Sequence, residues 1–132
     1  MRSECQASGS PEEPTFEYYD QFPLTTNDPL VNDRVTEAFR AHFGTEQVFH
    51  TEPNTASEDF STIPDAFGIP YTYWMVGSTP PDKLAAARAP ESTESDIPAN
   101  HSPFFAPAID PTLETMTRAA AVAALVYLGG ES

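Results

Sequence analysis

The sequence predicts an α/β fold in which helices cover a mostly parallel sheet. Segments that favour strands alternate along the chain with segments that favour helices, and such alternation is typical of layered α/β domains. The run at 71–76 has few polar atoms on either face, as expected of a strand that is buried on both sides. Two or three strands make a thin sheet, so we interpret the chain as part of a domain.

The first predicted elements precede residue 27. Residues 1–9 can form the last turns of a helix, for which Gly9 supplies the stop. Residues 15–22 are rich in β-branched and aromatic side chains and predict a strand. Pro23 ends this strand, and an acidic, turn-forming linker separates it from the helix.

The next element is a helix with clear signals at both ends. Asn27 or Asp28 can cap it, and Pro29 suits its first position. Apolar residues then recur at helical spacing as far as Phe43, and Gly44 supplies the stop. The residues that follow, 47–50, predict a short strand.

The second half of the chain begins with Thr55 and Glu58, whose spacing is that of a capping box and predicts a short helix. The buried strand at 71–76 comes next. We expect a long loop over 78–95, rich in Pro, Ala and acidic residues, with one turn of helix within 82–88. A helix over 110–127 follows, with an Asp-Pro start and a Gly-Gly stop.

The composition excludes several classes of function. Twenty acidic residues against six basic ones give a formal charge of -14, which opposes binding to nucleic acids or to anionic membranes. Cys5 is the one cysteine, so no disulfide forms within the chain, and nothing indicates a secreted scaffold. No apolar signal region begins the chain, and the apolar run at 119–128 is short of the ~20 residues that a membrane span needs. We therefore expect a soluble, cytoplasmic protein.

The stretch 97–107 places a single histidine, His101, between prolines. Prolines fix φ and push the preceding residue into extended conformations, so the loop is stiff and presents one side chain at a fixed place. Loops of this kind commonly carry function. For the other histidines we favour structural explanations: His42 lies in the last turn of a helix, and His50 packs at a strand end.

The adjacent carboxylates Glu58 and Asp59 have two interpretations. Neighbouring residues on a helix point ~100° apart, so both side chains cannot face one site. The pair either forms a capped, acidic first turn, or one carboxylate reaches a metal site or orients a ligand there. The capping-box spacing favours the first interpretation.

Several blocks of the sequence fall in one order along the chain. They are Asn27-Asp28-Pro29, Ala56-Ser57-Glu58-Asp59-Phe60-Ser61, Gly68-Ile69-Pro70, Tyr73-Trp74 with Gly77, Ile97-Pro98-Ala99-Asn100-His101-Ser102-Pro103, and Pro111-Thr112-Leu113. Together they resemble the C-terminal third of the metal-dependent amidohydrolases of the hippurate hydrolase, N-acyl-amino-acid and indoleacetyl-amino-acid hydrolase type. These enzymes belong to the aminoacylase and carboxypeptidase family of zinc peptidases, and the resemblance covers nearly the whole chain.

The resemblance implies an organisation. Residues 1–26 would be the closing helix and strand of an α+β lid domain that often mediates dimerisation, so a homodimer is expected. Residues 27–132 would be the C-terminal half of an α/β catalytic domain with two divalent metal ions, zinc by default with manganese or cobalt as alternatives. His101 would be a metal ligand.

The resemblance also implies roles around the metal centre. Glu58 and Asp59 match an acidic motif close to the site and would lie near the metals or on the substrate side without binding metal. The second imidazole nitrogen of a metal-bound histidine normally needs a hydrogen-bond partner, for which Asn100, Ser102 or a nearby backbone carbonyl is a candidate. The substrates of an intact member would be N-acyl amino acids or related small amides or peptides, and a metal-activated water would cleave the amide bond.

The chain departs from this family in one large respect. The metal motif, the general base and the other ligands of the N-terminal half are missing, so no catalytic residue is assigned here. A catalytic zinc takes about three protein ligands, and one cysteine with three histidines cannot rebuild a two-metal site. We therefore expect the parent enzyme to be a hydrolase and this chain alone to be inactive. The alternative is a non-catalytic interaction or dimerisation module derived from the same fold, which would bind through exposed sheet edges.

Overall fold

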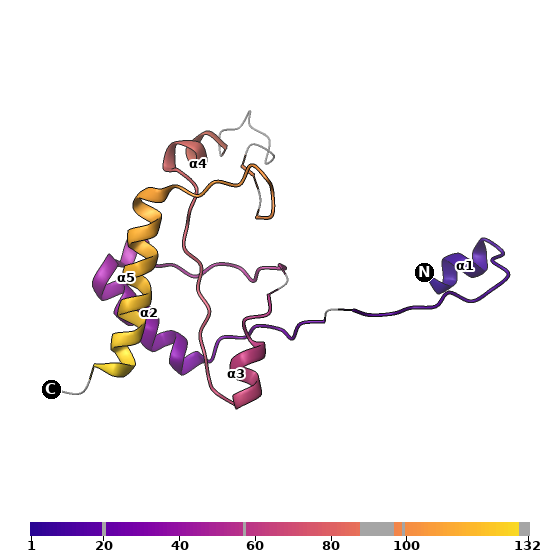
Figure 1. Cartoon of the computed structure of the whole chain (residues 1–132), viewed down its shortest axis with the longest axis horizontal. Coiled ribbons are helices and arrows are strands. Elements are labelled where there is room, and N and C mark those ends of the chain that lie inside the picture. The colour runs from indigo at the N-terminus through magenta and orange to yellow at the C-terminus, as the bar shows by residue number, and fades with distance from the viewer. Residues whose placement is uncertain (20, 57, 88–96, 99, 130–132) are drawn as a thin grey trace.

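The computed structural model describes residues 1–19, 21–56, 58–87, 97–98 and 100–129. Within these ranges the secondary structure is helical (Figure 1). The elements are α1 (Arg2–Ala7), α2 (Pro29–Phe43), the 3₁₀ turn η1 (Thr45–Gln47), α3 (Thr62–Phe67), α4 (Pro81–Ala87) and α5 (Ile109–Leu128).

The predicted α/β fold with a parallel sheet is wrong, because no strand forms among the described residues. The runs predicted as strands, 15–22 and 71–76, are coil where they are described, and the first residue of 47–50 belongs to η1. Alternating and aromatic-rich sequences favour an extended backbone. A strand also needs a neighbour that completes its ladder of hydrogen bonds, and this ladder is missing here.

A side chain takes the place of a neighbouring strand beside residues 71–73. The amide nitrogen of Asn27 donates to the carbonyl oxygen of Tyr73 at 2.9 Å, and the backbone N–H of Tyr73 donates to the Asn27 amide oxygen at 2.7 Å. The backbone N–H of Asp28 donates to the carbonyl oxygen of Tyr71 at 2.8 Å. The segment is thus fixed against the start of α2 without forming a sheet.

The helix predicted between Pro29 and Phe43 is confirmed as α2. The carboxylate of Asp28 accepts a hydrogen bond from the backbone N–H of Val31 at 3.0 Å, as an N-cap should. Gly44 ends the helix with a φ of 91°. Glycine adopts such a positive φ without strain because it has no Cβ.

The predicted C-terminal helix is confirmed as α5, with an irregular first turn. Asp110 is extended inside it, with φ -102° and ψ 129°, as expected of a residue that precedes proline. The regular part therefore begins at Pro111, in agreement with the predicted Asp-Pro start.

Two shorter predictions are also confirmed. α1 precedes Gly9, which has a φ of 68°, and α4 lies in the region where one helical turn was expected within 82–88. Residues 88–95 of the predicted loop lie outside the described residues. No helix in the described ranges has both the length and the apolar composition needed to cross a membrane.

The core lies where α2 packs against α5 (Figure 1). Val35 and Phe39 of α2 and Ala119 of α5 are its buried apolar residues. The Phe39 ring meets the Trp74 ring edge-on, with 5.3 Å between centroids. Arg34 extends the contact, because its guanidinium donates to the carbonyl oxygen of Val126 at 2.7 Å.

This core is small for the length of the chain. The accessible surface is 11212 Å², whereas a folded monomer of 14.4 kDa exposes about 6,800 Å². Part of the excess belongs to the N-terminal arm, which leads from α1 to α2 and extends away from the remainder of the molecule (Figure 1). The rest reflects large apolar side chains that stay uncovered on the helices and on the coil between them.

Replacing Asp28 by alanine should lower the free energy of unfolding by about 1 kcal/mol, because the N-cap acceptor of α2 is lost. Urea unfolding followed by circular dichroism measures this change. Asp28→Asn keeps an acceptor oxygen and should stay within a few tenths of a kcal/mol of the original chain. Equal losses in the two variants would contradict a capping role.

Candidate functional site

His101 lies in a tight turn of the loop that leads into α5. Its φ of 69° makes it the one non-glycine residue with positive φ among the described residues. Such a conformation is uncommon outside glycine and is retained where the surroundings enforce it. The backbone N–H of Phe105 donates to the carbonyl oxygen of Ser102 at 3.0 Å, and the His101 side chain is exposed.

The end of this loop is tied to the middle of the chain. The backbone N–H of Ala108 donates to the carbonyl oxygen of Ser78 at 2.8 Å. Ser78 belongs to the same run of coil that Asn27 holds at Tyr73. The loop that carries His101 is therefore connected to the start of α2 through this run of coil, by the side-chain bonds of Asn27 at one end and the backbone bond of Ala108 at the other.

Neither residue predicted to support the imidazole is seen to do so. The hydroxyl of Ser102 accepts a hydrogen bond from the backbone N–H of Phe104 at 3.2 Å, so it stabilises the turn. Asn100 is exposed in the same turn. Within the described part of the chain, no hydrogen bond joins either side chain to the ring of His101.

Glu58 is held by a neighbour that the sequence did not indicate. Its Oε2 accepts a hydrogen bond from the Tyr73 hydroxyl at 3.1 Å, and its Oε1 accepts from the backbone N–H groups of Asp59 and Phe60, both at 3.1 Å. The Tyr73 hydroxyl, followed by the Phe60 N–H, lowers the pKa of the Glu58 carboxyl below its ordinary value. Burial, followed by the hydrogen bond to Glu58, raises the pKa of Tyr73.

Among the described residues 55–56 and 58–61, the helix predicted to begin at the Thr55–Glu58 capping box does not form. The Glu58 carboxylate closes the turn formed by its own two successors, and α3 begins only at Thr62. Asp59 is exposed, and its carbonyl oxygen accepts from the Thr62 N–H at 3.0 Å. Local bonds made by the acidic side chain thus replace the reciprocal bonds of a capping box.

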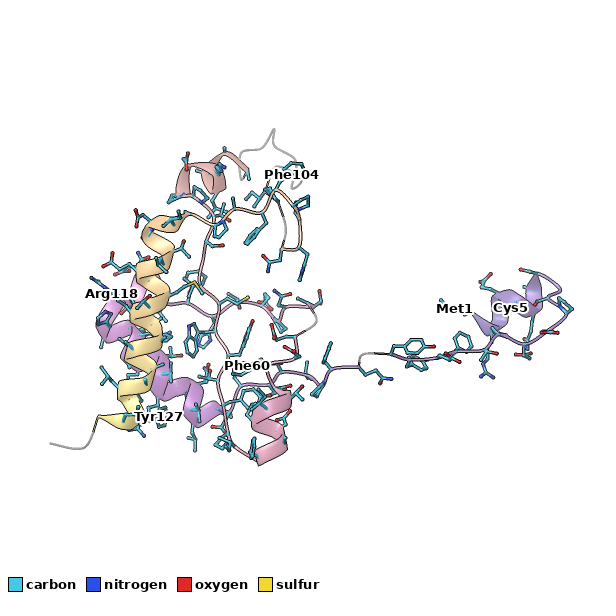
Figure 2. The ribbon with its side chains drawn as sticks, in the orientation of Figure 1. Met1, Cys5, Phe60, Phe104, Arg118 and Tyr127 are labelled. Atoms are coloured by element: carbon cyan, nitrogen blue, oxygen red, sulfur yellow. The ribbon has the colours of Figure 1, made fainter. Side chains whose placement is uncertain are left out.

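An aromatic cluster lies behind Glu58. The ring of Phe60, labelled in Figure 2, lies 5.2 Å from that of Tyr73 and 5.6 Å from that of Tyr71. Residues two apart in an extended chain point to the same side, so the pattern Tyr-x-Tyr could have indicated this shared face. An open hollow of about 510 Å³ adjoins it, lined by Phe22, Glu58, Asp59, Phe60, Thr62, Ile63 and Pro64.

The predicted site residues do not assemble into one metal centre. The parts of the chain that the structure describes contain no group of three or more His, Cys, Asp or Glu side chains that could hold a metal ion, so His101 does not join both Glu58 and Asp59. A catalytic zinc takes about three protein ligands. The described residues therefore do not fit a complete site, and His101 can supply one ligand at most.

No protein-family model matches the chain.

Replacing Glu58 by glutamine should lower the pKa of Tyr73 towards its ordinary 10.0 while leaving it raised, since burial is the larger cause. NMR titration of ring-labelled tyrosine measures this change. Asp59→Asn is the matched control, because Asp59 does not contribute to the Tyr73 pKa, and it should leave the titration unchanged.

The hydrogen-bonded pair of Glu58 and Tyr73 also determines the direction in which the free energy of unfolding changes with pH. Because the Tyr73 pKa is raised, the contribution of Tyr73 to the free energy of unfolding is fully present below pH 10.0. It is lost as pH rises through the raised pKa. Because the Glu58 pKa is lowered, the contribution of Glu58 to the free energy of unfolding is fully present above pH 4.5. It is lost as pH falls through the lowered pKa. A Tyr73→Phe variant that keeps the full pH dependence of unfolding would contradict this pairing.

Proposed function

We propose that the chain is a fragment of a metal-dependent amidohydrolase that cleaves the amide bond of N-acyl amino acids or related small amides. In this proposal His101 contributes one ligand to a centre of two divalent metals, zinc by default with manganese or cobalt as alternatives. The observation that carries the proposal is the conformation of His101. The exposed side chain of His101 lies on a proline-flanked loop, and the backbone of His101 has a φ of 69°. Backbone strain of this kind clusters at ligand-binding sites.

The role of this chain is to position that imidazole. The hydrogen bonds that close its turn at Ser102 and tie the loop to Ser78 at Ala108 hold the backbone that follows His101. The remaining metal ligands and the general base come from outside the chain, so the chain by itself is inactive. Glu58 and Asp59 stay on the substrate side without binding metal.

A non-catalytic interaction module is the second candidate. The observation that favours it is the excess of exposed surface: 11212 Å² against the about 6,800 Å² of a folded monomer of this mass. Such a surface is typical of chains that bind a partner. A module of this kind would not depend on His101.

The deciding experiment measures hydrolysis of N-acetyl amino acids and of hippurate with added zinc, manganese or cobalt. The chain is assayed alone and then mixed with a separately expressed N-terminal half of a related amidohydrolase. We expect turnover only in the mixture, and we expect His101→Ala to reduce it at least a hundredfold, because loss of a metal ligand removes metal binding or activation.

His50→Ala is the matched control, since His50 is also an exposed histidine and lies outside every block of the resemblance. It should retain full turnover in the mixture. Turnover by the chain alone would overturn the fragment proposal, because the other ligands would then lie within it. Binding of the second half without any turnover would favour the interaction module.

A further inference from the structure

We draw no further inference here: the strongest candidate, the uncovered apolar face of α5 formed by Leu113, Met116 and Tyr127, carries no proposal, because nothing in the structure shows what covers it.

Discussion

The structure depends on the contact between α2 and α5, because little else in the described residues is buried. Val35, Phe39 and Ala119 form this contact, and the edge of the Phe39 ring adds Trp74. The free energy of unfolding is a small difference between the gain from burial and the cost in conformational entropy. With so small a core, it depends on very few side chains. Truncating Phe39 would remove one of the contact's three buried apolar side chains.

A short series of hydrogen bonds connects the loop that carries His101 to the contact between α2 and α5. Asn27 and Asp28, at the start of α2, hold the backbone around Tyr73 and Tyr71. The same run of coil reaches Ser78, which accepts from the N–H before α5. This run of coil therefore meets the start of α2 at one end and the start of α5 at the other, where it fixes the C-terminal end of the loop that carries His101.

Sequence reasoning succeeded where the signal is local. The Asp-Pro starts and glycine stops located α2 and α5, because caps and stops act within one turn. It failed at the strands, since pairing depends on partners far along the chain or outside it. It also failed at Glu58, whose carboxylate prefers its neighbours' N–H groups and the Tyr73 hydroxyl. A bond between residues 58 and 73 has no local signature.

The double hydrogen bond of Asn27 limits which residues this position can hold. One terminal atom of its amide donates to the backbone of Tyr73 and the other accepts from it. Aspartate has the same shape and can only accept when ionised, while glutamine has both groups on a longer stem. The two bonds to the backbone of residue 73 therefore require a side chain at position 27 with a particular length and with both a donor and an acceptor. Of these three side chains, asparagine alone has both the length and the donor–acceptor pair that the two bonds require, at a position that is only half-buried.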